Sequence, residues 1–135
     1  METDPGKLLA AIRYMTLATA DEDGRPWASP VWFAAPAADE LLWVSDPSAR
    51  HSRNIAARPE VAIAVFDSTV AEGDAWGLYM EATAAETDAA AVGRFDEDWT
   101  IEDVTAPAKH RLYAANVRRW WVLGPRDERI EVRPG

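Results

Sequence analysis

Basic and hydroxyl-bearing side chains gather in one short segment, SDPSARHSRN at residues 45–54. Ser45 follows an apolar run, and Ser48 stands where a helix is expected to begin, as its N-cap. Arg50 and His51 come directly afterwards. A helix N-terminus offers unpaired N–H groups and a partial positive charge, and arginine adds a planar charged fork that fits phosphate. The segment therefore indicates an anion-binding site, although a capped helix with a solvated polar face would have the same composition.

Other kinds of active site find little support in the sequence. The chain has no cysteine, which excludes thiolate catalysis and thiolate metal sites. Its two histidines, His51 and His110, lie far apart and form no metal-ligand motif, so no metal site is expected. No serine lies in a G-x-S-x-G motif, and neither G-x-G-x-x-G nor a Walker loop is present. Seven tryptophans are a second signal, because they provide flat surfaces for a core, a dimer interface or a planar ligand.

The elements that must position these residues are mainly strands. Strands are expected over residues 16–20, 26–34, 41–45, 61–66, 77–84, 110–123 and 129–132, with a break near 118–119. Helices are expected over residues 7–14, 49–58 and from 87 to about 95, and loops over 35–40 and 67–76. An Asp-Gly turn at residues 21–24 and other short connections favour antiparallel pairing. We therefore predict a single domain over residues 1–135, mainly β: a six- to seven-stranded antiparallel split β-barrel with short flanking helices.

Residues in the segment 26–34 should alternate between the two faces of the sheet. Trp27, Ser29 and Val31 fall on one face. Pro30 and Trp32 fall on the other. A proline inside the run is typical of an edge strand or a bulge.

Charge and hydropathy limit the partners and the location. The net charge is −9, which argues against sequence-independent nucleic-acid binding, because that depends on neutralising phosphates. No apolar run approaches the length of a membrane helix, so no membrane partner is expected. The first six residues lack the basic and apolar regions of a signal peptide, so we expect a cytoplasmic protein.

The order of these segments resembles the pyridoxamine 5′-phosphate oxidase-like family of flavin-binding split β-barrels. The resemblance rests on the Asp-Gly turn, on PVWF at residues 30–33, on WVS at 43–45 and on SARHSRNIAARPEV at 48–61. It extends from about Ile12 to Val132. What it implies is a homodimer that binds two flavin mononucleotides (FMN) at the subunit interface.

The resemblance also implies roles for individual residues. The phosphate-binding basic pair of the family falls on Arg50 and His51, where the family often has lysine at the second position. A hydroxyl of the phosphate site falls on Ser45. The strand beside the isoalloxazine ring falls near Pro30, Val31 and Trp32, and Ser48 completes the expected set of cofactor-binding residues. The function expected from the resemblance is an FMN-dependent oxidoreductase acting on a small molecule.

Three alternatives remain open at this stage. A deazaflavin could occupy the same phosphate site. A non-catalytic protein could store flavin, or could hold haem with His51 or His110 as an axial ligand. A dimeric scaffold without any cofactor is the third.

Overall fold

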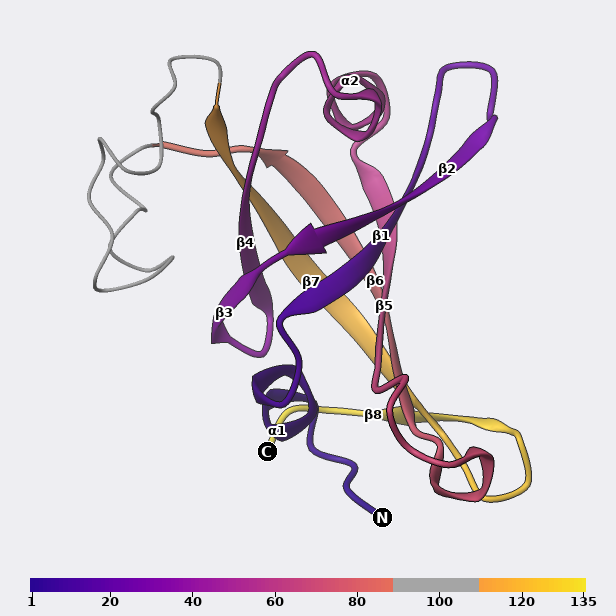
Figure 1. Cartoon of the computed structure of the whole chain (residues 1–135). Helices are drawn as coiled ribbons and strands as arrows, with labels where there is room; N and C mark the ends of the chain where they lie inside the picture. Colours follow the sequence, from indigo (N-terminus) through magenta and orange to yellow (C-terminus); the bar gives the residue numbers. More distant parts are fainter. Residues whose placement is uncertain (89–109) are drawn as a thin grey trace.

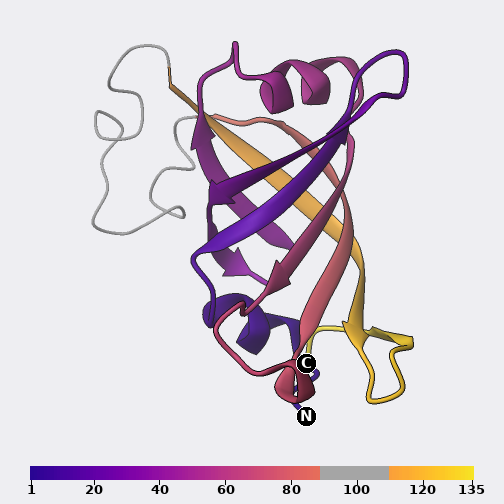
Figure 2. The same cartoon turned by 45° about the vertical axis from the view of Figure 1, so that its right-hand side comes forward.

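A curled antiparallel sheet with a helix at each end makes up the computed structural model, which describes residues 1–88 and 110–135 (Figure 1). The strands are β1 (Tyr14–Ala20), β2 (Pro26–Trp32), β3 (Ala34–Ala37), β4 (Glu40–Ser45), β5 (Glu60–Phe66), β6 (Gly77–Glu86), β7 (Arg111–Leu123) and β8 (Arg129–Val132). The helices are α1 (Pro5–Ala10), α2 (Arg50–Ala57) and the short 3-10 helix η1 (Glu72–Asp74). Helices α1 and α2 lie at opposite ends of the curled sheet (Figure 2).

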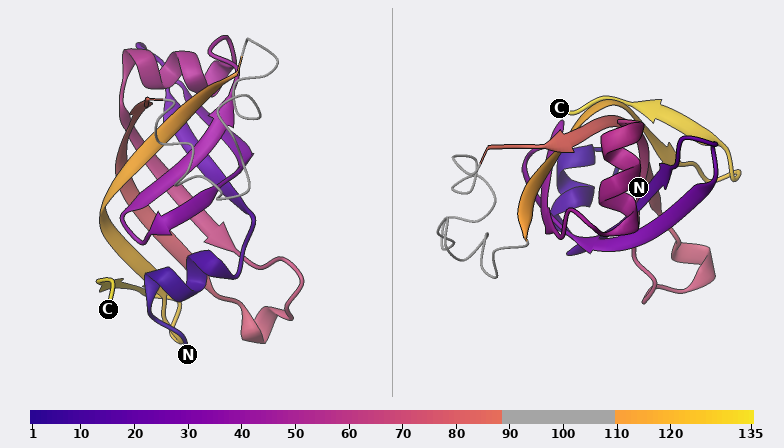
Figure 3. Two further views of the ribbon diagram at one scale, coloured as in Figure 1. Left: turned by 90° about the vertical axis from the view of Figure 1, so that its left-hand side faces the viewer. Right: turned by 90° about the horizontal axis from the view of Figure 1, so that it is seen from above.

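The strand order explains how the sheet becomes a split barrel. The order is β2-β1-β5-β6-β7-β4-β3, β8 pairs with β7 outside this path, and every pair is antiparallel. Phe33 alone separates β2 from β3, so one nearly continuous stretch connects the two edges of the sheet. Seen from above, the strands surround a central space that α2 crosses (Figure 3). The predicted mainly β, antiparallel split barrel is therefore confirmed.

The described residues contain eight strands, one more than the sequence predicted. The additional strand is β3, in a segment that we expected to be a loop because it is AAPA, with little β-propensity. It forms because a tight turn brings it back against β4, with Ala34 opposite Leu42 and a register shift before Ala37. Tertiary pairing here overrides local propensity.

The core fills the inside of the curl with large side chains. Along β5, Val61, Ile63 and Val65 are buried, whereas Ala62 between them is exposed. Trp43 is fully buried and stacks on Tyr113 with ring centroids 5.9 Å apart. Because side chains alternate along each strand, the outer face carries a separate set of residues.

Several predicted boundaries change in the structure. Helix α1 begins and ends earlier than expected, because Pro5 starts it and β1 already pairs with β2 from Tyr14 onward. Ser48 is not the cap of α2: the N-cap is Ala49, and the Ser48 hydroxyl donates to Asp46 Oδ1 at 2.9 Å. The break expected near 118–119 in the last long strand is not present: β7 is continuous, and only its register opposite β6 shifts there, between the Glu81–Arg119 and Ala82–Val117 pairs.

Two further expectations concern the remaining segments. The loop expected at 67–76 contains η1. The helix expected from 87 to about 95 falls almost wholly outside the described residues, although the Thr87 N–H donates to the Leu112 carbonyl at 2.8 Å. In residues 1–88 and 110–135, no helix has both the length and the apolar character needed to span a bilayer.

Candidate functional site

Helix α2 lies across the open end of the barrel, between β4 on one side and β1 and β2 on the other (Figure 1, Figure 3). It packs on β1, β2 and β6, and its buried residues are Ile55 and the polar Ser52 and Asn54. Asn54 Nδ2 donates to Thr19 Oγ1 at 3.0 Å, so a buried hydrogen bond fixes the helix on β1. The segment singled out by the sequence therefore starts at the end of β4 and continues over the barrel mouth.

His51 connects two strands that are not neighbours in the sheet. Its Nε2 lies 2.7 Å from the Ser45 hydroxyl at the end of β4, and its Nδ1 lies 3.2 Å from the Ser29 hydroxyl on β2. Burial lowers the pKa of His51 below its ordinary value. At neutral pH the imidazole is therefore uncharged and shares hydrogen bonds with two hydroxyls, and the positive charge of the site comes from arginine.

Arg50 contacts a neighbouring position on the same strand, β2. Its guanidinium lies over the Trp27 ring, with 4.3 Å between Cζ and the ring centroid. Within the part of the chain that the structure describes, neither Arg50 nor Arg53 has an ion-pair partner. No side chain caps α2, so the N–H groups of its first turn also remain available to a ligand. Arg50 thus adds an unneutralised cation to an uncapped helix start.

A polar cleft of about 430 Å³ separates α2 from the β1–β2 turn. Its lining residues are Arg50, Arg53, Asn54 and Ala57 from α2, and Asp21, Glu22 and Asp23 from the turn. The cleft therefore carries arginines on one wall and carboxylates on the other. An anion bound there would lie on the arginine wall, because the opposite wall repels it.

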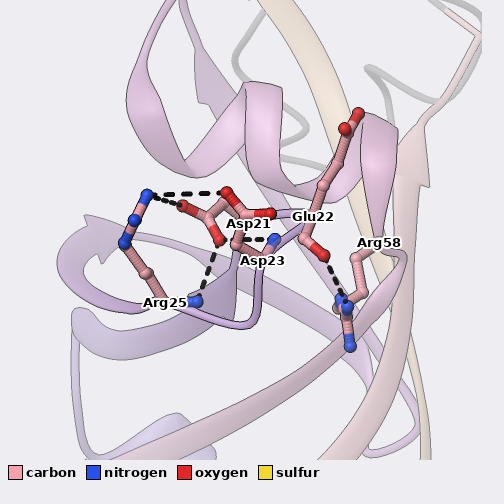
Figure 4. A network of polar contacts seen from close by, with 5 residues as sticks. All are labelled: Asp21, Glu22, Asp23, Arg25 and Arg58. Carbon is pink, nitrogen blue, oxygen red and sulfur yellow. Dashed lines mark hydrogen bonds and ion pairs between the residues drawn. The ribbon is translucent and has the colours of Figure 1, made fainter.

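The acidic turn is held in place by its own hydrogen bonds (Figure 4). Asp21 Oδ1 accepts the N–H groups of Asp23 and Arg25, both at 2.9 Å. These bonds, the Arg25 bond first, lower the pKa of Asp21, and the nearby charge of Arg50 acts in the same direction. Arg58 Nη2 donates to the Glu22 carbonyl at 3.1 Å and so ties the turn to the end of α2.

The structure brings together some of the residues singled out by the sequence and separates others. Ser45 and His51 are in contact, whereas Ser48 bonds to Asp46 instead. Pro30 is exposed and Trp32 half-buried on the outer face of β2, as the predicted alternation requires. Val31 faces inward and is only 8% exposed, so a ligand outside the barrel could reach its backbone but not its side chain.

Two partners of the basic residues were not predicted as site residues. They are Trp27, which supports Arg50, and Ser29, which contacts His51. The available signal was the alternation along β2, which places both on the face that turns toward α2.

The outer face of the sheet beside Pro30 is apolar and hollowed. Small side chains of β1 and β5 form the floor of a groove of about 240 Å³, and aromatic side chains of β6 and β7 line its side. We call this surface the outer apolar face. Its residues are Thr16, Ala18, Ala62, Ala64, Tyr79 and Trp121, with the exposed Tyr14 (62%) and Phe66 (54%) beside them and Glu81 as the one charged residue that lines the groove. Pro30 lies opposite Thr16 in the β1–β2 pair and so borders this face.

The arrangement is an antiparallel split barrel with an uncapped, basic helix start at its mouth, and a fold of this kind does not by itself fix a function. The family model described as pyridoxamine 5′-phosphate oxidase matches residues 6–126. The chain belongs to this family. The resemblance inferred from the sequence is thereby confirmed.

Solved structures with the same fold include proteins named for different cofactors. HutZ, the haem storage protein from Vibrio cholerae, has 24% identity and a TM-score of 0.69, with 87% of this chain and 92% of HutZ covered. A haem-binding protein from Mycobacterium smegmatis has 21% identity and a TM-score of 0.72; the match covers 96% of this chain but 56% of that one. An FAD-binding protein from Mesorhizobium loti has 19% identity and a TM-score of 0.68, with 87% and 89% covered. No curated protein matches the sequence.

Proposed function

We propose that this protein binds FMN with its phosphate at the start of α2, and that it is an oxidoreductase for a small molecule. The observation that carries the proposal is the uncapped start of α2, where Arg50 has no ion-pair partner within the described residues. A phosphate ester is a dianion that takes charged forks, hydroxyls and helix N–H groups as donors. Arg50, Ser45 and the first N–H groups of α2 supply such donors, so the residues fit the group; Ser48 would join them only by releasing the Asp46 carboxylate to which its hydroxyl donates.

His51 contributes a hydrogen bond rather than a charge to this proposed site. A neutral imidazole donates through one nitrogen and accepts through the other. Its contact with Ser45 lets it orient that hydroxyl toward a phosphate oxygen. The protein thereby holds the ester through one cation and several neutral donors.

The proposed place for the isoalloxazine ring is the outer side of β2, along Pro30, Val31 and Trp32. FMN, when bound, supplies the hydride chemistry of such a protein. The side chains of Pro30 and Trp32 would orient the ring and exclude water, and Val31 would take part through its backbone. Strand β2 lies at the edge of the described sheet and pairs there with β1 on one side. The backbone groups on its other side are therefore suited to contact with a ligand.

The proposed assembly is a homodimer that covers the outer apolar face. Tyr14 and Phe66 expose large hydrophobic areas beside a floor of alanines, and contiguous apolar patches of this kind mark interaction sites. Because Pro30 borders the same face, a second copy docked there would also enclose the ring. Each FMN would then lie at the subunit interface.

The test is a titration of the apo-protein with FMN and with riboflavin, which lacks the phosphate. We expect FMN to bind at least about ten-fold more tightly, and Arg50→Ala to remove most of that difference, because charged hydrogen bonds of this kind contribute about 1.5–3 kcal/mol. The matched control is Arg118→Ala, an exposed arginine on β7. Equal affinity for the two flavins, with no effect of Arg50→Ala, would contradict the proposal.

Haem is a second candidate, because two of the similar structures are named as haem proteins. His110, half-buried directly before β7, would then be the candidate axial ligand, since both ring nitrogens of His51 already contact serines. The spectrum of the purified protein separates the candidates. A Soret band that His110→Ala abolishes supports haem, a flavin spectrum supports FMN, and the shifted band of a deazaflavin supports that cofactor in the same site.

A further inference from the structure

Strand β2 contacts the first two residues of α2 through side chains that are two positions apart. Trp27 lies under the guanidinium of Arg50, and the Ser29 hydroxyl contacts the ring of His51. We propose that Trp27 and Ser29 are positioning residues that hold Arg50 and His51 ready for the phosphate before the cofactor arrives. This inference rests on the proposed function and adds two residues that act through the phosphate ligands.

The Trp27–Arg50 contact fixes the cation without using its donors. A guanidinium that lies over an aromatic ring contacts it with the flat face of the guanidinium. The N–H groups around the edge of the guanidinium therefore remain free for a phosphate. Trp27 is 41% exposed, so the pair lies at the surface of the barrel mouth, where a ligand can reach it. Without the ring, the long arginine side chain would be free to turn toward the carboxylate of Asp21 across the cleft.

The Ser29–His51 contact holds the imidazole from its buried side. Ser29 is 8% exposed, and its hydroxyl lies 3.2 Å from His51 Nδ1. Both ring nitrogens of His51 contact serines, so a ligand at the barrel mouth would meet the Ser45 hydroxyl, whereas His51 and Ser29 act behind it. By holding Nδ1, Ser29 directs Nε2 toward the Ser45 hydroxyl, 2.7 Å away.

A buried chain of hydrogen bonds keeps β2 aligned with α2. Asn54 Nδ2 donates to Thr19 Oγ1 at 3.0 Å, and Thr19 Oγ1 donates to the Trp27 carbonyl at 3.4 Å. Thr19 is 4% exposed and Asn54 is 5% exposed, so solvent does not compete for these bonds. The backbone that carries Trp27 is thus attached to the helix that carries Arg50, and the two side chains stay in register.

The first test measures FMN and riboflavin affinities, by flavin fluorescence, for Trp27→Leu and Trp27→Phe. We expect Trp27→Leu to weaken FMN binding about two- to five-fold and to leave riboflavin binding unchanged, whereas Trp27→Phe keeps a ring and the affinity. In the Arg50→Ala background, Trp27→Leu should have no further effect, because a positioning residue acts through its partner. Additive losses, or equal losses for both flavins, would overturn the inference.

The second test applies the same logic to Ser29. Ser29→Ala should weaken FMN binding about three-fold and leave riboflavin binding unchanged. In the His51→Gln background, Ser29→Ala should have no further effect on FMN affinity. Ser68→Ala, an exposed serine after β5, is the matched control. If the wild type prefers FMN and Arg50→Ala loses that preference while Trp27→Leu and Ser29→Ala keep it, the positioning roles are wrong and the proposed function stands. If the wild type does not distinguish FMN from riboflavin, the proposed function itself is wrong.

Discussion

Burial favours the neutral form of His51 in the native protein, where its ring nitrogens contact two serine hydroxyls. Burial lowers the native pKa of His51 below 6.5, whereas the unfolded chain titrates near the ordinary value. As the pH falls through about 6.5, the unfolded chain therefore takes up a proton that the native protein does not. The free energy of unfolding should therefore fall as the pH is lowered through this range. Above about pH 7, where both states are deprotonated, the contribution of His51 should be fully restored.

The measurement is urea denaturation between about pH 7.5 and pH 5, a window above the range in which Asp21, with its lowered pKa, titrates. We expect His51→Gln to flatten the pH dependence and His110→Gln to leave it unchanged. A His51→Gln protein with the wild-type slope would show that another group is responsible.

The contacts of single residues were the least predictable part of the site. The run of basic and hydroxyl residues predicted an anion-binding site from local order alone, and that site stays a prediction. The contact between Ser29 and His51 joins residues 22 apart in the sequence and depends on how α2 settles over β2, which no local pattern specifies. The prediction that Ser48 caps α2 was wrong, because the Ser48 hydroxyl donates to the Asp46 carboxylate instead.

The β1–β2 turn is the element whose conformation depends most directly on one residue. Gly24 has a φ of +84°, a conformation that L side chains rarely adopt, while a Cβ added there would meet nothing within 4 Å. Gly24→Ala should therefore destabilise the protein by about 1 kcal/mol through backbone conformation alone. The measurement is the urea midpoint at constant m-value.

Gly73 provides the matched control for this turn. A Cβ there also meets nothing within 4 Å, and its φ lies outside the left-handed region. Gly73→Ala should change stability by less than about 1 kcal/mol and in the stabilising direction, because alanine restricts the unfolded chain. Equal losses for the two variants would mean that the positive φ of Gly24 is not the cause of the loss.

The elements themselves could be predicted from alternation and turn chemistry. The pattern along residues 26–34 correctly separates Ser29 and Val31 from Pro30 and Trp32, because a buried face imposes a period of two. Strand β3 could not be predicted, since alanine and proline carry no such signal and only the closure of the barrel pairs them with β4. The helix expected from residue 87 lies mostly outside the described residues, so that prediction remains untested.

At the scale of the whole molecule, the sheet has two unlike faces. Large side chains such as Leu17 and Ile63 fill the inner face, and alanines with exposed aromatic side chains occupy the outer apolar face. A groove floored by small residues permits close approach of a second copy, and the aromatic residues around it supply contact area. The proposed dimer follows from this asymmetry.

Ala62→Arg tests the dimer without disturbing the fold. Ala62 is exposed on β5 and pairs with Glu81 on β6, so the introduced guanidinium gains an opposite charge directly across the strands. In a dimer, the same charge would be buried against the second copy, so we expect a monomer by sedimentation and light scattering at micromolar concentration. FMN affinity should fall at least about ten-fold in parallel, because the ring would lose the partner that encloses it.

Ala10→Glu, on the exposed side of α1, is the control and should remain dimeric. A wild type that sediments as a monomer, or an Ala62→Arg protein that stays dimeric, would show that the outer apolar face is not the interface between subunits.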